Sequence, residues 1–384
     1  MQEPLTLKDK IRIRLKSQRE FPVLLILVMA LVLSAFFALL VRRDYQSLEL
    51  NPAEVKSLPL ADQVESTAVA SSEIPEEITV NFYGNLQMNA GLRQYLKKAD
   101  YRRFFSQLMP LLSEAQFNII NLDSPAELDG DAPEAFSKSD IEALRSLNFR
   151  IFPLANSNFC PLKGEPSDLL LAELSQLPID FIGFGENNAR AAAGQRLPYG
   201  DRAVRLFSTS AYGRNQRASY FESGMSIATD IQVFDRVTSA KVRGEYVIVM
   251  IHWGNLYNSR LGDYQAELAR RYVDAGADLV IGSSPGPAAT IEEYKQGLIC
   301  YNLGSLQQTP ADGLLRPGFV LSLTLSEAHG PELEFIPFSQ HIGLPAPISQ
   351  DRYLETIREQ LEAHMTQFHM ADGSAGRFIL TEQP

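Results

Sequence analysis

The residues of this chain that are best suited to chemistry stand at the ends of apolar runs. The run Tyr246–His252 ends in an imidazole and is followed by Trp253 and Gly254, and Asp123 directly follows the run Asn118–Leu122. Aliphatic and β-branched runs that stop at small or polar residues are typical of buried parallel strands. Proteins with α/β folds place their sites at the carboxyl ends of such strands. A carboxylate and an imidazole there can hold a divalent cation or transfer a proton.

A framework of strands and helices must position these side chains. The patterns predict strands at Ile78–Tyr83, Asn118–Leu122, Arg150–Leu154, Asp180–Phe184, Val204–Phe207, Tyr246–His252, Asp278–Gly282, Leu298–Tyr301, Phe319–Leu325 and Glu332–Phe338. They predict helices at Leu92–Leu112, Ser139–Leu147, Ser167–Leu177, Asp263–Ala275 and Asp351–Phe368. The first part alternates strand and helix and the last part is rich in strands. We therefore expect an α/β fold of layered sheets flanked by helices.

The N-terminal part of the chain predicts a membrane anchor. Pro22–Val41 is an uncharged, mostly apolar run that is long enough to cross a bilayer as a helix. A cleaved signal peptide and a buried core helix are the alternatives. Basic residues before the run outnumber those after it, so we expect a single-pass protein of the plasma (inner) membrane with a cytoplasmic N-terminus and an extracytoplasmic or periplasmic main domain. The basic residues before the run are Lys8, Lys10, Arg12, Arg14, Lys16 and Arg19.

Composition sets the remaining boundaries. We expect a basic cytoplasmic segment at 1–21, the membrane helix at 22–41, a polar linker at 42–77, the main domain at 78–340, and a C-terminal helix and tail at 341–384. The net charge of −11 argues against nucleic-acid binding, which needs a basic surface. The two cysteines, Cys160 and Cys300, allow at most one disulfide, and the sequence leaves open whether it forms.

The strand ends also carry a family resemblance. In chain order they read YGNLQMN, NIINLDSP, PLANSN, FIGFGEN, VIVMIHWGN, YVDAGADLVIGSSPG and ICYNLGSL. This succession resembles the poly-γ-glutamate capsule biosynthesis (CapA) family over residues 78–338. The resemblance implies a calcineurin-like metallophosphoesterase-type β-sandwich flanked by helices, with metal-ligand loops at the strand ends. It also implies an extracytoplasmic domain on one membrane helix.

Several of the ligand positions implied by the resemblance hold other residues in this chain. Asn85 stands where the family has an aspartate, and Asp123 stands where it has a glutamate. The family's Asn-Asn-His reads Asn156–Asn158 with serine in the middle, and its Gly-His-His-Pro-His reads Gly282–Gly286 without a histidine. Its His-Trp-Gly is intact at His252–Gly254.

These replacements leave few strong ligands for a metal. A two-metal hydrolytic site needs several carboxylates and imidazoles, whereas the matching positions here supply Asp123 and His252. We therefore expect no cofactor and a degenerate site, with a weakly held divalent metal such as Mn or Fe as the alternative. Asp123 and His252 are the candidate catalytic residues. The candidate binding residues at the site are Asn85, Asn156, Asn158 and Trp253.

Each of these residues also has a structural interpretation. His252 can be a strand-end histidine that is hydrogen-bonded in the core. Trp253 can fill the edge of the core. Asp123 can cap a turn together with Ser124 and Pro125.

An arginine-rich segment offers a second way to bind an anion. Its basic residues are interleaved with tyrosines and accompanied by one acidic residue, Asp201; they are Arg190, Arg196, Arg202, Arg205, Arg214 and Arg217. Arginine can hold a carboxylate or phosphate with two hydrogen bonds. Arg202 and Arg205 are therefore candidate binding residues for an anionic polymer, and a solvated loop face is the alternative.

Taken with the resemblance, these features predict a membrane-anchored CapA-like pseudoenzyme. We expect a non-catalytic accessory or binding subunit in the synthesis or export of an anionic capsule polymer, either poly-γ-glutamate or an acidic polysaccharide. The alternatives are a metal-dependent hydrolase acting on such a polymer and a scaffold for other membrane proteins of capsule synthesis or export. A shared fold does not by itself decide among these functions.

Overall fold

The structure, a computed structural model, describes the outer part of the chain. It covers residues 74–96, 100–130, 132–254, 262–286, 288–307, 318–341, 344–348, 358, 368–372 and 378–382. The predicted membrane helix and nearly all of the linker lie outside the described residues. So does most of the predicted C-terminal helix, although Arg358 is helical and Phe368 begins a strand. Within the described residues, no helix is both long and apolar enough to cross a membrane.

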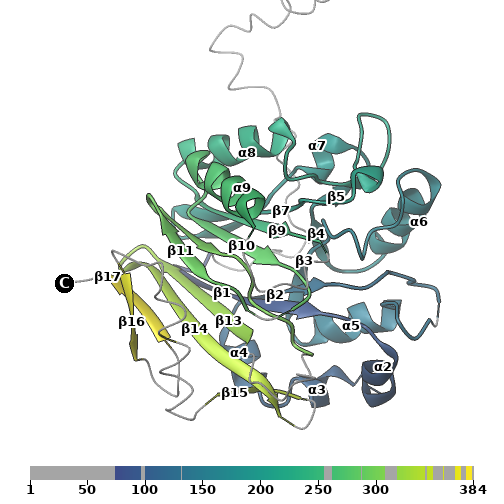
Figure 1. The fold of residues 1–384 in the computed structure, drawn as a ribbon, viewed down its shortest axis with the longest axis horizontal. Helices are drawn as coiled ribbons and strands as arrows, with labels where there is room; N and C mark the ends of the chain where they lie inside the picture. The colour runs from purple at the N-terminus through teal and green to yellow at the C-terminus, as the bar shows by residue number, and fades with distance from the viewer. Residues whose placement is uncertain are drawn as a thin grey trace, which may run out of the picture. The chain divides into compact units, whose positions relative to one another are not determined.

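One mixed sheet runs in the order β16, β17, β14, β13, β1, β2, β3 and β4, with β15 beside β14 (Figure 1). Its strands are β1 Glu77–Leu86, β2 Phe117–Leu122, β3 Phe149–Pro153, β4 Asp180–Ile182, β13 Gly318–Ser326, β14 Gly330–His341, β15 Leu344–Pro347, β16 Phe368–Asp372 and β17 Phe378–Glu382. Strands β1 to β4 are parallel, and β13 is antiparallel to β1. The carboxyl ends of β1, β2 and β3 therefore meet at one edge of the sheet.

A second sheet runs in the order β11, β12, β10, β9, β7 and β6. Its strands are β6 Gln195–Tyr199, β7 Arg202–Ser210, β9 Tyr246–His252, β10 Leu279–Ser283, β11 Ile291–Tyr294 and β12 Gly297–Cys300. The four central strands are parallel, and the two edge strands are antiparallel to their neighbours. A small separate ladder joins β5 Phe184–Gly185 to β8 Gly224–Met225.

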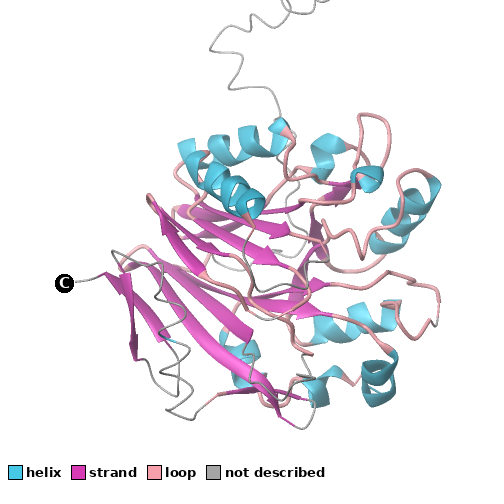
Figure 2. Ribbon diagram, in the orientation of Figure 1, coloured by secondary structure: helices cyan, strands magenta, loops and turns pink. Residues whose placement is uncertain are grey.

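The two sheets pack against each other, and helices cover their outer faces (Figures 1 and 2). Alternation along the strands produces these layers: Ile248 on β9 packs between the sheets, while its neighbour Val249 packs under the helices. Helices α8 and α9 cover the second sheet, and α2 to α6 cover the first. The helices are α2 Ala90–Leu96, α3 Tyr101–Phe104, α4 Met109–Glu114, α5 Lys138–Ser146, α6 Glu165–Leu174, α7 Asn188–Ala191, α8 Ile231–Val242 and α9 Asp263–Asp274, with the 3-10 turn η1 at Arg214–Gln216.

The layered α/β architecture confirms the predicted fold class, and two local predictions were wrong. The single helix predicted over Leu92–Leu112 is three short helices, because Asp100 caps the start of α3 and Pro110 stands in the first turn of α4. The strand predicted over Asp180–Phe184 is broken at Gly183, whose φ of 84° is left-handed. Helix α8 was not predicted.

Candidate functional site

Asp123 lies just beyond β2, within a group of side-chain amides. Its Oδ1 accepts hydrogen bonds from Nδ2 of Asn158 at 2.8 Å and of Asn156 at 3.2 Å. Its Oδ2 accepts from Asn85 Nδ2 at 3.1 Å and from Gln87 Nε2 at 3.3 Å. The carboxylate is fully buried, so these amides replace its hydration. We call this group the amide network; its members are Asn85, Gln87, Asn121, Asp123, Asn156 and Asn158.

The amides also bond to one another. The parallel register sets Asn85 beside Asn121, and Asn121 Nδ2 donates to Asn85 Oδ1 at 2.7 Å. Asn156 Nδ2 donates to Asn121 Oδ1 at 3.1 Å, and the backbone N–H of Asn158 donates to Asn156 Oδ1 at 2.8 Å. An ionised carboxylate can only accept hydrogen bonds, so the amides that face it must present their NH₂ groups. The side-chain oxygens of Asn85, Asn121 and Asn156 are thus used inside the network.

His252 ends β9 and faces the same carboxylate. Its Nε2 lies 3.9 Å from Asp123 Oδ1, and its side chain is 2% exposed. Neither ring nitrogen has a hydrogen-bond partner among the described residues. Burial lowers the pKa of His252 to about 4, while the charge of Asp123 acts in the opposite direction. The prediction of a core histidine was right about its burial and wrong about its hydrogen bonding.

Trp253 occupies the core position that the structural interpretation expects. Its side chain is fully buried, and its Nε1 donates to the backbone oxygen of Tyr301 at 2.9 Å. Gly282 makes this packing possible, because a Cβ added there would lie 2.1 Å from Trp253 Nε1. A role for Trp253 in binding stays a prediction.

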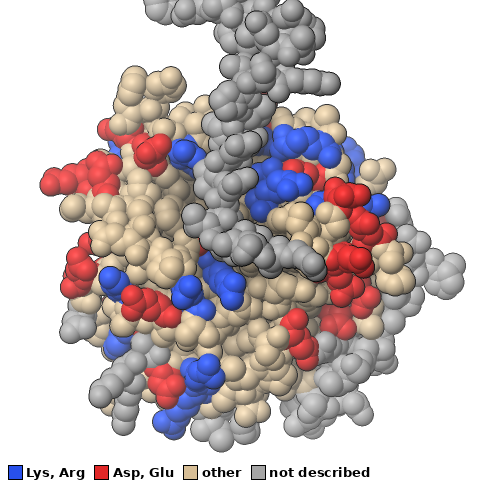
Figure 3. Space-filling view, turned by 180° about the vertical axis from the view of Figure 1, so that it is seen from behind, with Lys and Arg blue, Asp and Glu red and all other residues tan. Residues whose placement is uncertain are grey.

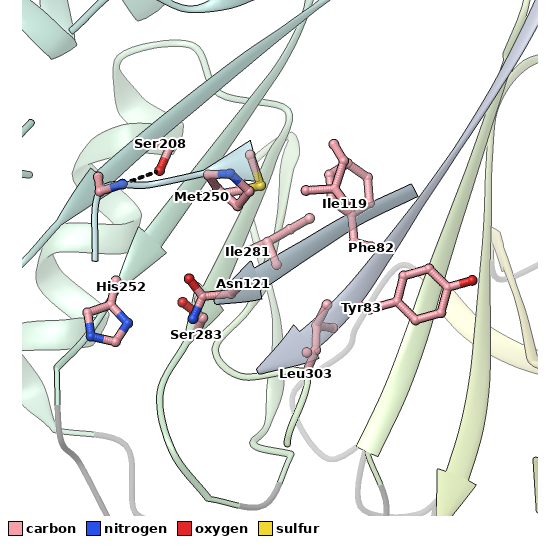
Figure 4. A pocket seen from close by; sticks show the side chains of 14 residues that line it. Phe82, Tyr83, Ile119, Asn121, Ser208, Met250, His252, Ile281, Ser283 and Leu303 are labelled. Carbon is pink, nitrogen blue, oxygen red and sulfur yellow. Dashed lines mark hydrogen bonds between the residues drawn. The ribbon is translucent and has the colours of Figure 1, made fainter. Parts of the chain in front are cut away.

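A small cavity lies between the two sheets at their loop ends (Figure 4). His252, Asn121 and Ser283 lie toward its polar end, and Phe82 and Met250 are among its apolar walls. Its volume is about 20 Å³, which is room for about one water molecule.

The donor set of this site does not fit a pair of divalent metal ions. Within the described residues, no group of three or more His, Cys, Asp and Glu side chains is placed to hold a metal. Asp123 receives four amide N–H bonds, and amide oxygens that could serve a hard cation already accept bonds within the network. A two-metal centre needs several anionic or imidazole ligands directed at common points.

The two predicted arginines lie away from the amide network, on the amino-terminal half of β7. Arg205 is buried and pairs with Glu245 at 2.9 Å, where Arg196 also makes an ion pair at 3.3 Å. Arg202 is exposed at the start of the strand. Basic and acidic side chains lie interspersed on the face shown in Figure 3. Polymer binding by Arg202 and Arg205 stays a prediction, and the buried ion pair gives Arg205 a structural role.

The two cysteines are free thiols. Both are buried, and they belong to different core clusters: Cys160 lies on the helix side of the first sheet and Cys300 lies between the sheets. Burial raises the pKa of Cys160 to about 12. The optional disulfide is therefore not formed in this structure.

Sequence reasoning missed two members of the amide network. Asn121 precedes Asp123 in the same Asn-Leu-Asp motif, and Gln87 stands two positions after Asn85. The signal was present as a run of amides at successive strand ends. It was overlooked because amides are weak metal ligands, whereas here they solvate a carboxylate.

Comparison with known proteins identifies the class. Residues 79–308 match the family described as bacterial capsule synthesis protein PGA_cap. The match spans more than half of the chain, so the chain belongs to this family, which confirms the resemblance seen in its motifs.

Two relatives share most of their length with the chain. It is similar to the capsule biosynthesis protein CapA of Bacillus anthracis, with 22% identity over 316 residues that cover 78% of this chain and 76% of that protein. It is also similar to the PGA biosynthesis protein CapA of Bacillus subtilis, with 22% identity over 284 residues that cover 71% and 74%.

Two further likenesses are more distant or shorter. A probable polyglutamine synthesis accessory protein of Mycobacterium tuberculosis is 22% identical over 229 residues, which cover 54% of this chain and 60% of that protein. Among solved structures, the crystal structure of TT1561 of Thermus thermophilus is 12% identical with a TM-score of 0.34, covering 67% of this chain and 97% of that chain.

Proposed function

We propose that this protein is a membrane-anchored, non-catalytic accessory subunit in the synthesis or export of an anionic capsule polymer. Its family and the names of its relatives support a role in capsule biosynthesis. The polymer class is poly-γ-glutamate or an acidic polysaccharide. Partner proteins would be other membrane proteins of capsule synthesis or export.

The observation that carries the non-catalytic assignment is the amide network. Asp123 is buried and receives hydrogen bonds from four neutral side chains. This arrangement stabilises one negative charge without a cation. A metallophosphoesterase would need that carboxylate to hold a metal ion, so the network uses the residue for structure.

A calcineurin-like metallophosphoesterase fold is part of the proposal. Two mixed sheets pack face to face between helical layers, and the polar residues gather at the carboxyl ends of the parallel strands. This is the architecture that the family resemblance implies. The fold would thus be kept while the chemistry of its site is lost.

The membrane anchor is likewise proposed, from the apolar run Pro22–Val41 and the basic residues before it. The described chain enters the domain at the other end of the sheets from the amide network: Gly200 N donates to Pro75 O at 2.8 Å, and β1 begins at Glu77 and ends at Leu86 beside the network. The surface around the network therefore lies at the opposite end of the strands from Pro75.

One observation favours a second candidate, a metal-dependent hydrolase. Neither ring nitrogen of His252 has a partner among the described residues, and its Nε2 lies 3.9 Å from Asp123 Oδ1. A buried unpaired imidazole has a free energy cost that a functional role would explain.

Metal analysis and complementation separate the two candidates. The full-length protein, purified in detergent and dialysed mildly, should contain much less than one equivalent of Mn, Fe or Zn. The variant His252→Gln, expressed at the wild-type level, should still support polymer production in cells that lack the protein. Stoichiometric metal together with loss of polymer production in this variant would establish the hydrolase instead.

A further inference from the structure

Of the six arginines in the segment 190–217, Arg214 is the one whose charge is free to meet a ligand near the amide network. Four of the others form ion pairs with carboxylates, namely Arg190 with Glu186, Arg196 and Arg205 with Glu245, and Arg217 with Asp230. Arg202 lies at the start of β7, opposite Tyr199 on β6 and away from the amide network. Arg214 is exposed and makes no ion pair among the described residues.

The turn that carries Arg214 is held in place by its contacts with Met225 and with the loop that follows β3. Gly213 has a left-handed φ of 88°, and a Cβ added there would lie 2.2 Å from Met225 Cε. Gln216 Nε2 donates to the backbone oxygen of Ser157 at 2.8 Å and also to that of Cys160. These bonds fix η1 to the loop that supplies Asn156 and Asn158 to the amide network. The backbone that carries Arg214 is therefore fixed, which lowers part of the entropy cost of binding a ligand there.

Two tyrosines lie in the neighbourhood of this cation: Tyr212 stands two residues before Arg214, and Tyr264 is in the first turn of α9. Tyr212 and Tyr264 are each 46% exposed, and the ring of Tyr212 covers Gly254, two residues beyond His252. Partial burial raises the pKa of Tyr264, with a further rise from Tyr212 and opposing effects from Arg214 and Arg271, so Tyr264 lies within electrostatic range of Tyr212 and Arg214. Half-exposed tyrosine rings combine apolar area with a hydroxyl group at low entropy cost.

We propose that Arg214, Tyr212 and Tyr264 form a surface subsite that binds a carboxylate-bearing unit of an acidic polymer. This inference rests on the proposed function and names where the polymer is held. Arg214 binds the carboxylate with charge-assisted hydrogen bonds, and the tyrosine rings pack against the carbon skeleton of the unit. The cavity of about 20 Å³ is too small for such a unit, so the chain of the polymer runs over the outside of the site.

The test measures polymer binding by the full-length protein in detergent. The probes are poly-γ-glutamate, polygalacturonate as a carboxylate polysaccharide, and dextran as a neutral polymer. The variant Arg214→Gln is compared with Arg190→Gln, which removes the same charge from an exposed ion pair. Both variants are checked for an unchanged melting temperature.

We expect the wild type to bind at least one carboxylate polymer more tightly than dextran, with affinity falling as salt rises. Arg214→Gln should raise the Kd about tenfold or more, and Arg190→Gln should change it by less than about twofold. Unchanged binding by Arg214→Gln, or an equal loss in both variants, would overturn the subsite and leave the proposed function standing. If the wild type binds neither acidic polymer, both the subsite and the proposed function are rejected. If it binds one of them more tightly, that preference shows whether the carboxylate belongs to a polyglutamate or to an acidic polysaccharide.

Discussion

The imidazole of His252 and the carboxylate of Asp123 face each other at 3.9 Å in the core, yet it is the surrounding amides that donate hydrogen bonds to the carboxylate. The amides satisfy the negative charge without needing a proton on the histidine. Burial then keeps the imidazole neutral at ordinary pH. The free energy of unfolding should therefore depend on pH through the protonation of His252.

Stability should fall between pH 6.5 and about 4 because of His252. Its pKa is lowered from 6.5 to about 4 in the folded protein, so in this window the unfolded state binds a proton that the folded state does not. The free energy of unfolding then decreases as pH falls, by up to about 3 kcal/mol, and levels off below the folded pKa. Urea unfolding at several pH values checks this. The variant His252→Gln should lose that part of the slope, and an identical pH profile in the variant would contradict the assignment.

Replacing Asp123 by Asn should destabilise the protein even though it removes a buried charge. Asparagine keeps one acceptor oxygen, but its NH₂ group would face two of the four amide donors, which would lose their acceptor at a cost of about 2–4 kcal/mol. The matched control is Asp129→Asn, an exposed carboxylate on the same connection, which should change stability by no more than about 0.5 kcal/mol. A variant Asp123→Asn that is more stable than the wild type would contradict this prediction. It would show that the buried charge of Asp123 destabilises the folded protein.

The substitution Gly282→Ala should disrupt the packing of Trp253. The added Cβ would lie 2.1 Å from both Trp253 Nε1 and the backbone oxygen of Tyr301, so the strand end must shift, at a cost of about 3 kcal/mol or more. Gly91→Ala, where the nearest atom is a side-chain oxygen at 3.3 Å, should be neutral or slightly stabilising in helix α2. Thermal unfolding compares the two variants, and equal melting temperatures would argue against the close contact.

Both cysteines should be present as unreactive thiols. Burial raises the pKa of each and blocks access to them. At pH 8, alkylation should be slow in the folded protein and fast after unfolding in guanidinium chloride. Mass analysis without reductant should show two free thiols, and a mass lower than that of the reduced protein by about two hydrogen atoms would reveal a disulfide.

The sequence predicted the parallel strands well because their apolar runs are long and end abruptly. Tyr246–His252 is β9 residue for residue, and the predicted strands Ile78–Tyr83 and Asn118–Leu122 lie within β1 and β2. Local patterns failed where capping and turn geometry decide the outcome. Asp100 begins a new helix inside an amphipathic stretch, and α8 buries only Val233, Val237 and Ala240 fully, with Phe234 partly buried beside them.

The site was only partly predictable for a different reason. Residue types at strand ends indicate which side chains meet, and Asp123, Asn85, Asn156, Asn158 and His252 do lie together. Their roles depend on which side chain donates and which accepts each hydrogen bond across the strands. The spacing of residues in the sequence does not indicate this. The arginines illustrate the same limit of local sequence patterns. Arg205 pairs with Glu245, which lies 40 positions further along the chain. Arg214 is the same residue type and lacks such a partner among the described residues because of its different surroundings.

Trp253 is the single tryptophan of the chain, and it is buried directly after His252 with its N–H on the backbone of Tyr301. The tryptophan fluorescence of the protein therefore originates from the residue that follows His252. Its emission should be that of an indole shielded from water, and any ligand or pH change that moves the strand-end loops should alter its intensity. Ligand binding at the strand-end loops can thus be followed by the emission of Trp253, without a label or a substitution.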